Sequence, residues 1–381
     1  MSDRATGSAT NDITAHRRRT SGRTRLVRAA SEARGDHARP PAIACAQTGR
    51  GAMAATEMAP GGLTPEHPRA RRRIPVLFIA GAARSGSTLL DRAIGMRDGF
   101  CSLGELQFIW QRSFGENQLC GCGAPFHDCG FWREVSFAAF GSEPADVDEL
   151  AAQRLKAQVD HKRRIPALAL NAPGPMRRAL REYGELIERL YGAILDVAGA
   201  RVIVDSSKDP RHGLALARLD CIELHVVHLI RDPRAVAYSW GRRRERPEIH
   251  WRKQEMMRQS VRASAARWTT HNAVVELLCA TAHRHDRVRY EDFVADPSGV
   301  VSQILAPFGC ADAPAPGSPG ELVLEPSHSV SGNPMRFDSG TVRVKLDDEW
   351  RAAMPLRDRA SVAAVTWPLL ARYGYHLRAG A

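Results

Sequence analysis

The sequence of 381 residues has few aromatic residues, 6% of the total, and none of them occurs before Phe78. Residues 1–73 also lack lysine, but they hold 14 arginines against six acids and so account for eight of the twelve net positive charges. A segment of this kind has too little apolar material to build a core, which predicts a disordered basic extension over 1–73. Because the basic excess lies mainly there, the overall charge does not indicate nucleic-acid binding, and we expect no nucleic-acid partner.

Long apolar runs are missing as well. No stretch is long enough to span a membrane, and none has the apolar centre of a secretory signal. We therefore expect a cytoplasmic protein whose eight cysteines stay mostly reduced. Residues 1–73 are similar to a transit peptide in being rich in arginine and poor in acids, while a translation start at Met53 or Met58 is an alternative interpretation.

What the sequence does contain is a strand, loop and helix pattern that occurs three times. Residues 76–80 are an apolar run typical of a buried parallel strand, and residues 201–205 and 224–230 are two further predicted strands with apolar centres; each of the three is followed by a polar loop and a helical segment. Asp209-Pro210 and Asp232-Pro233 are typical helix starts, with the acid as N-cap and proline in the first turn. Residues 74–381 therefore predict a single α/β domain, with a P-loop-like parallel sheet flanked by helices.

The remaining segments fit around this sheet. Residues 103–199 predict a mostly helical insertion that lies over the carboxyl edge of the sheet and shapes a binding pocket there. Further along, we expect a helix over 258–283, a strand over 287–290 and a last helix over 359–373. Residues 314–319 are rich in proline and glycine and predict a break between elements. Oligomeric state cannot be predicted, because an apolar helix face packs equally well within one chain or between two.

The loop after the first strand is the most informative segment. Residues 81–88 read Gly-Ala-Ala-Arg-Ser-Gly-Ser-Thr, close to the P-loop pattern in which backbone N–H groups and a helix N-terminus hold phosphate. The lysine of that pattern is replaced by Ser87, which argues against triphosphate chemistry, and a cation lies instead inside the loop at Arg84. Three alternatives remain open: a tight turn without a ligand, a P-loop kinase or NTPase with Asp205 as magnesium ligand, and a nucleotide-binding protein without turnover.

This loop resembles the 5′-phosphosulfate loop of the sulfotransferases that use 3′-phosphoadenosine 5′-phosphosulfate (PAPS). The resemblance implies that the donor is bound by Arg84, Ser85, Gly86, Ser87, Thr88 and Leu89. Arg231 at a strand end, with Ser239 eight residues later, resembles the 3′-phosphate motif of the same family. The similarity covers about residues 75–345 and is greatest to the bacterial carbohydrate-type and tyrosylprotein-type branches.

The resemblance also implies catalytic roles. Glu105 stands where the tyrosylprotein-type enzymes carry their general base, and Lys208 stands where the family has a lysine that assists the leaving group together with Arg84. Alternatives are a helix-start glutamate bonded to backbone N–H groups and His127 as a competing base. The expected reaction is metal-independent sulfuryl transfer to an acceptor hydroxyl, on a saccharide or glycolipid first and a phenol or protein tyrosine second.

Residues 331–337 resemble the late loop that covers the nucleotide in this family, although they lack its Arg-Lys-Gly pattern. By this resemblance Ser331, Gly332 and Arg336 are further candidates for donor binding.

A cysteine-rich segment has no assigned role. Cys120, Cys122 and Cys129 with His127 could supply three sulfurs and one nitrogen to zinc, or two of the cysteines could form a disulfide. Their spacing matches no standard metal motif, and the sequence alone therefore predicts no metal site.

Overall fold

The computed structural model describes residues 73–171, 174–310 and 320–376. A five-stranded parallel sheet lies at its centre, with the strand order β2-β3-β1-β4-β5. The strands are β1 (Ile74–Ala80), β2 (Phe100–Ser102), β3 (Val202–Lys208), β4 (Ile222–Ile230) and β5 (Arg284–Arg289). The predicted α/β parallel sheet is confirmed. The predicted extension up to residue 72 and the predicted break at 314–319 lie outside the described residues.

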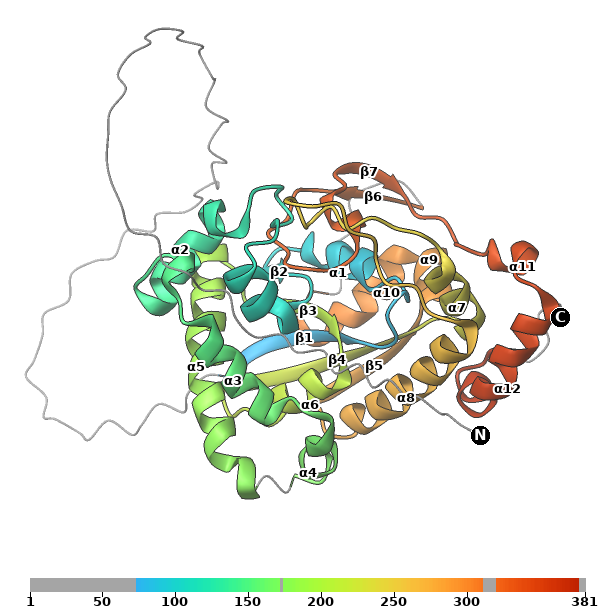
Figure 1. Ribbon diagram of the computed structural model, residues 1–381, viewed down its shortest axis with the longest axis horizontal. Helices are drawn as coiled ribbons and strands as arrows, with labels where there is room; N and C mark the ends of the chain where they lie inside the picture. Colours follow the sequence, from blue (N-terminus) through green and yellow to red (C-terminus); the bar gives the residue numbers. More distant parts are fainter. Residues whose placement is uncertain (1–72, 172–173, 311–319, 377–381) are drawn as a thin grey trace, which may run out of the picture. The chain divides into compact units, whose positions relative to one another are not determined.

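Side chains along β1 point alternately to the two faces of the sheet, and because both sets are apolar, helices cover both faces. Val76 and Phe78 pack into one apolar cluster, and Leu77 and Ile79 pack into another. The first cluster contains α5 (Arg177–Ala198), α6 (Pro210–Leu216) and part of α8 (Val261–Cys279). The second contains α1 (Ser87–Gly95) and α10 (Pro297–Leu305), so that the sheet is the middle of three layers (Figure 1).

The two Asp-Pro sequences begin helices as predicted. The Asp209 carboxylate accepts the Arg211 N–H at 3.0 Å and begins α6, and Asp232 accepts the Arg234 N–H at 2.8 Å and begins α7 (Pro233–Gly241). Each helix follows directly from the carboxyl end of a strand. These caps therefore fix where the chain turns over the sheet edge.

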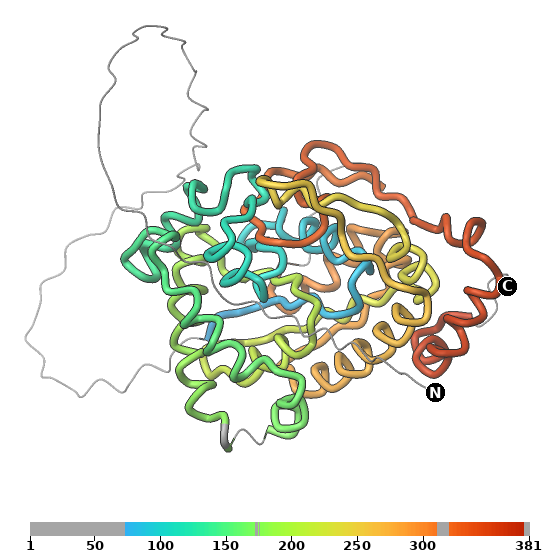
Figure 2. Tube along the Cα trace, viewed as in Figure 1, coloured from blue at the N-terminus to red at the C-terminus, as the bar shows by residue number. Residues whose placement is uncertain are grey.

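The predicted insertion is mainly helical and joins β2 to β3. Its α-helices are α2 (Gly130–Phe140), α3 (Glu149–Val159), α4 (Ile165–Ala169) and α5. Helices α2 and α3 pack on α5, which packs on β1 and β3, so most of the insertion covers a face of the sheet. Figure 2 shows this path in teal and green. Among the described residues of the insertion, those that line a cavity at the carboxyl edge come from its start, between residues 105 and 112.

The C-terminal part adds shorter elements around the edge. An antiparallel pair, β6 (Glu321–Leu324) and β7 (Gly340–Arg343), was not predicted from the sequence. The other α-helices of the described residues are α9 (Tyr290–Ala295), α11 (Trp350–Ala353) and α12 (Leu356–Arg372), and α12 packs on α7 and α8. Among the described helices, none combines the length and the apolar character that crossing a membrane requires.

Candidate active site

The loop between β1 and α1 provides the backbone of the site. Gly81 has a φ of 145°, and a Cβ there would lie 2.2 Å from a carbonyl oxygen of β4. Gly86 begins α1 with a φ of 87°, and a Cβ there would lie 2.5 Å from the Tyr290 ring. Arg84 lies between the glycines and also has a left-handed φ, 73°. The loop therefore fits closely between β4 and Tyr290, and the first turn of α1 faces a cavity.

This cavity has a volume of about 810 Å³ and lies at the carboxyl ends of β1, β3 and β4. Carboxyl ends of neighbouring parallel strands are the usual ligand site of such sheets. Among the described residues, eight cations and five carboxylates line it, so the lining has a positive excess suited to an anion. The cations are Arg84, Arg112, Lys208, Arg211, Arg231, Arg244, Arg246 and Arg267.

Glu105 and Lys208 meet at the floor of the cavity. The Lys208 Nζ donates to Glu105 Oε1 at 2.6 Å and to the Ser206 carbonyl at 2.9 Å, and both charged side chains are nearly buried, with 11% and 13% exposed. The Glu105 N–H donates to the Val330 carbonyl at 2.8 Å. The Glu105 carboxylate therefore pairs with Lys208 across the cavity floor and does not cap the helix that it precedes.

The position of Lys208 differs from the prediction. The sequence suggested a strand that ends at Asp205 and a loop over 206–208, whereas β3 continues to Lys208. Phe78 of β1 pairs with Asp205 but Ala80 pairs with Lys208, so β3 holds one extra residue at this point, as in a β-bulge. Lys208 also has a positive φ of 67°. The bulge and this φ together direct the lysine toward Glu105.

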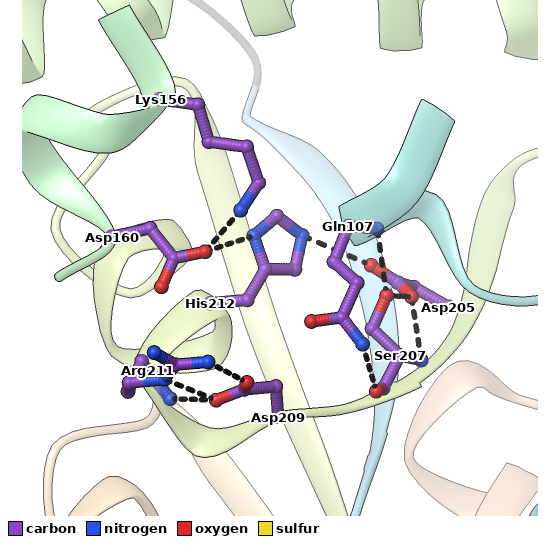
Figure 3. A network of polar contacts seen from close by, with 8 residues as sticks. All are labelled: Gln107, Lys156, Asp160, Asp205, Ser207, Asp209, Arg211 and His212. Carbon is purple, nitrogen blue, oxygen red and sulfur yellow. Dashed lines mark hydrogen bonds and ion pairs between the residues drawn. The ribbon is translucent and has the colours of Figure 1, made fainter. Parts of the chain in front are cut away.

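A buried polar network supports this bulge (Figure 3). Asp205 Oδ1 accepts the Ser207 N–H at 2.8 Å as well as the Ser207 hydroxyl, and Ser207 Oγ accepts the Gln107 N–H at 2.9 Å. On the other side, the His212 ring lies between Asp205, at 3.5 Å, and Asp160, at 3.9 Å. Asp205 is fully buried and does not line the cavity. It is therefore placed to hold the bulge and not to hold a magnesium ion beside a nucleotide.

Arg84 projects among aromatic and sulfur-containing side chains. Its guanidinium lies 4.9 Å from the centre of the Trp240 ring, and Nη2 lies 2.9 Å from Met256 Sδ. Burial and the nearby Arg244 lower the pKa of Arg84 to about 10, although Glu105 opposes this change. Arg84 therefore stays cationic at neutral pH, in a partly desolvated position where its charge acts strongly on a bound anion.

Arg231, directly after β4, and Ser239 of α7 both line the cavity. The Arg231 Nη1 donates to the Arg84 carbonyl at 3.0 Å, and Nη2 forms an ion pair with Asp347 at 3.2 Å. The guanidinium also lies 4.5 Å from the centre of the Tyr290 ring. Ser239, in the last turn of α7, is buried and lines the cavity. The 3′-phosphate candidates and the loop candidates are thus connected through the Arg84 carbonyl.

The three candidates in the late loop, residues 331–337, differ in how they lie relative to the cavity. Gly332 lines it, and a Cβ there would lie 3.6 Å from Glu105 Oε1. Ser331 has a positive φ of 56° and points its Oγ toward Arg112, at 3.5 Å. Arg336 does not line the cavity, because it is buried and donates to the Ser329 and Leu119 carbonyls, each at 2.6 Å. The structure therefore gives Arg336 a different place from the one that the sequence suggested.

Comparison with known proteins decides the family. A family model described as "Sulfotransferase family" matches residues 75–314, which is more than half of the chain. The chain belongs to the sulfotransferase family. No match was found among curated proteins.

Among solved structures, the chain is similar to the sulfotransferase domain of the Synechococcus PCC 7002 olefin synthase. That match has 19% identity and a TM-score of 0.48, and covers 82% of this chain and 98% of that one. A sulfotransferase domain from the curacin biosynthetic pathway matches with 17% identity and a TM-score of 0.42, covering 81% and 100%.

Membership of this family implies PAPS as the donor, and the cavity of this sulfotransferase fits such an anion. The Ser85 Oγ is buried and has no hydrogen-bond partner among the described residues, but Ser85 does not line the cavity, whereas Gly86, Ser87 and Thr88 at the start of α1 do. Arg84, Lys208 and Arg231 all line the cavity and add positive charge to it. The lining therefore offers positive charge of the kind that attracts phosphate and sulfate groups.

Several cavity residues were missed from the sequence. Arg244 and Arg246 belong to the basic run 242–246 after α7, a signal that was present but not used. Arg112 lies in a π-helical turn, Ile109–Gly115, of a kind often found at functional sites, and nothing in the local sequence marks it. Asp347 reaches Arg231 from 116 residues further along the chain, which only the tertiary fold reveals.

Proposed function

We propose that this sulfotransferase moves the sulfuryl group of PAPS to an acceptor hydroxyl by in-line displacement, without using a metal ion in the reaction. The observation that carries this proposal is the Lys208–Glu105 pair, 2.6 Å long, at the edge where the Arg84 loop also ends. A carboxylate and two cations in one partly desolvated cavity can supply a base and stabilise a leaving phosphate.

Glu105 is the proposed general base. It takes the proton of the acceptor hydroxyl as the oxygen forms its bond to sulfur and the bond from sulfur to the phosphate oxygen breaks. Negative charge then grows on the leaving phosphate, where Lys208 and Arg84 stabilise it. In the structure Lys208 is paired with Glu105. When the donor binds, its phosphate becomes a second anionic partner for Lys208. The Glu105 carboxylate is then free to accept the proton of the acceptor hydroxyl.

Arg231 and Ser239 are the proposed ligands of the 3′-phosphate, and residues 84–89 of the 5′-phosphosulfate. Arginine gives charge-assisted, bidentate contacts to phosphate, and the serine hydroxyl adds a donor. Arg231 already pairs with Asp347 at 3.2 Å, so the phosphate must replace or share this partner. Ser331 and Gly332 are proposed as weaker contributors, through the backbone of the late loop.

The proposed acceptor is a saccharide or a glycolipid, with a phenol as the alternative. Gln107, Arg112 and Glu248 line the cavity near Glu105 and can bond to several hydroxyl groups of one ligand. Phe108 and Trp240 also line it and provide flat apolar surfaces suited to a sugar ring or a phenol. The polar side chains favour the acceptor with many hydroxyl groups.

The test is an acceptor screen with PAPS in buffer free of Mg²⁺, in which both the bisphosphate product and the sulfated acceptor are measured. We expect equal amounts of the two products, with a saccharide or glycolipid among the active acceptors. Transfer of phosphate from ATP that depends on Mg²⁺ would instead support a kinase. Tight donor binding with no transfer to any class of acceptor would support a binding protein.

A further inference from the structure

Three cysteines and a histidine come together beside the active site, from segments about 200 residues apart. Cys129 Sγ lies 3.7 Å from Cys120 Sγ and 3.7 Å from Cys122 Sγ. His328 Nδ1 lies 3.4 Å from Cys129 Sγ and 3.8 Å from Cys120 Sγ. All four of these atoms lie within 4.8 Å of one another. The histidine is not the one that the sequence offered, since His127 Nε2 lies 2.9 Å from the Phe114 carbonyl oxygen instead.

These distances match the edges of a zinc tetrahedron. With Zn–S bonds of about 2.3 Å and Zn–N bonds of about 2.0 Å, tetrahedral geometry places two sulfurs about 3.8 Å apart and a sulfur and a nitrogen about 3.5 Å apart. A disulfide would need its sulfurs at about 2.05 Å, and the three cysteines are free thiols. Four ligand atoms arranged around one centre, of the soft types that zinc prefers, indicate a shared ion.

The backbone around the first two cysteines forms a tight turn suited to this purpose. The Gly123 N–H donates to the Cys120 carbonyl at 2.9 Å, and the Cys120 N–H donates to the Ala124 carbonyl at 2.8 Å. Gly123 has a φ of 90°, which favours glycine. Gly121 has no room for a side chain, because a Cβ there would lie 2.5 Å from Ser329 Oγ. The turn therefore presses against the residue that follows the histidine.

Neighbouring side chains hold the histidine in position. The Phe131 ring stacks on His328 with centroids 4.6 Å apart and planes 7° apart. The Trp132 Nε1 donates to the His328 carbonyl at 3.0 Å. Partners that orient a ligating imidazole are typical of metal sites. Cys120 and Cys129 are buried while Cys122 is exposed, which gives an ion a path from solvent.

We infer that Cys120, Cys122, Cys129 and His328 bind one Zn²⁺ in a closed structural site. All four positions of the tetrahedron are protein ligands, so the ion has no open position for a substrate and takes no part in sulfuryl transfer. The role of the ion is to link residues 327–337 to residues 120–129 of the insertion. Arg336 links the late segment to the insertion a second time, because it donates to the Leu119 carbonyl as well as to the Ser329 carbonyl.

The zinc site is close to the catalytic residues along the backbone. Val330, two residues after the histidine, accepts the Glu105 N–H at 2.8 Å and donates to the Leu103 carbonyl at 2.8 Å. Gly332 then lines the cavity beside the Glu105 carboxylate. Loss of the ion should therefore loosen the backbone that positions Glu105, and lower turnover more than donor binding.

The test is the metal content of the full chain, purified without chelators from cells grown with zinc and measured by elemental analysis. We expect one zinc per chain, and release of that zinc when the thiols are titrated with a mercurial reagent. Replacement by Co²⁺ should give the charge-transfer absorption of a thiolate-bound ion. A zinc content below about 0.1 per chain would overturn the site, because structural zinc sites of this type bind tightly. A disulfide between two of the three cysteines in freshly purified protein would also overturn it.

Matched histidine variants test the ligand assignment. His328→Ala should lose the zinc and lower the Tm by at least about 5 °C, whereas His127→Ala should keep one zinc per chain. His328→Cys should restore zinc binding, since four cysteines also form structural sites. Retention of zinc in His328→Ala, or its loss in His127→Ala, would contradict the assignment. If His328→Ala does not fold, the Co²⁺ spectrum of the unmutated chain still decides the number of thiolate ligands.

Discussion

Two regions of this sulfotransferase differ in how they are built. The donor region (residues 81–89, 206–209 and 231–239) consists of short segments at strand ends, each with its chemistry in consecutive residues. The knuckle region (residues 117–129 and 327–337) consists of side chains that meet from distant parts of the chain, as Cys120 and His328 do across 208 positions. A donor region of this kind can be recognised in a sequence because the backbone performs much of the binding. The knuckle region becomes visible only when the chain is folded.

The largest effect that we expect in the donor region is at Arg84, the cation inside the loop after β1. Arg84→Ala should weaken donor binding and lower turnover by about 10³-fold or more, the scale of a cation that stabilises transferring charge in related chemistry. Turnover and calorimetric titration of the variant measure both effects. Arg154→Ala, an exposed arginine of α3, is the control and should behave as the unmutated protein. Unchanged turnover in Arg84→Ala would move the chemistry away from the donor region.

Glu105 lies outside both regions but contacts each of them, since its side chain pairs with Lys208 and its backbone N–H donates to the Val330 carbonyl. Glu105→Gln should lower turnover by about 10²–10⁴-fold, the usual contribution of a general base, and leave donor binding nearly unchanged. Single-turnover kinetics with a true acceptor measure this split. Glu134→Gln, an exposed glutamate of α2, serves as the control. If Glu105→Gln keeps full turnover, another group must take the proton.

Ser239 tests the far end of the donor region. Ser239→Ala should weaken binding of 3′-phosphoadenosine 5′-phosphate by about tenfold, the value of one hydrogen bond to a charged group. It should leave adenosine 5′-phosphosulfate, which lacks the 3′-phosphate, unaffected. Ser264→Ala removes another buried hydroxyl, outside the cavity lining, and should change neither affinity. Equal weakening of both nucleotides by Ser239→Ala would contradict the assigned contact.

Asp91 of α1 gives a smaller prediction, on stability. Burial is the main cause that raises the pKa of Asp91 to about 7, although a hydrogen bond from Ser102 at 2.7 Å opposes it. The folded chain therefore keeps this proton over a range where the unfolded chain has lost it, so stability from this group is lost as pH rises from about 4 to about 7. Asp91→Asn should add up to about 4 kcal/mol to the free energy of unfolding at pH 8.

The same variant should add almost nothing near pH 3.5, where Asp91 is protonated in both states. Urea unfolding at the two pH values measures this difference. Asp98→Asn, an exposed neighbour, should show little change at either pH. A gain of equal size at both pH values would mean that the substitution acts through packing and not through the buried charge.

Predictability from the sequence follows the same division. The three strand–loop–helix units and both Asp-Pro helix starts could be predicted, because they depend on local patterns of apolar residues and caps. The position of Lys208 could not, because its bulge depends on pairing with β1. The histidine of the cysteine cluster could not either, since His127 is close in sequence but His328 is close in space. Arg336 lies in a segment that resembles the late loop of the family, but its burial between two carbonyls depends on the whole fold.

The most direct test of the proposed function is calorimetric titration with 3′-phosphoadenosine 5′-phosphate, in buffer free of Mg²⁺ and again with Mg²⁺, beside ATP under both conditions. We predict tight binding of the bisphosphate that does not depend on Mg²⁺, and weak binding of ATP, because Ser87 replaces the lysine of a triphosphate loop and Asp205 is buried away from the cavity. Tight binding of ATP that requires Mg²⁺, with weak binding of the bisphosphate, would contradict the assignment of this cavity to a sulfuryl donor.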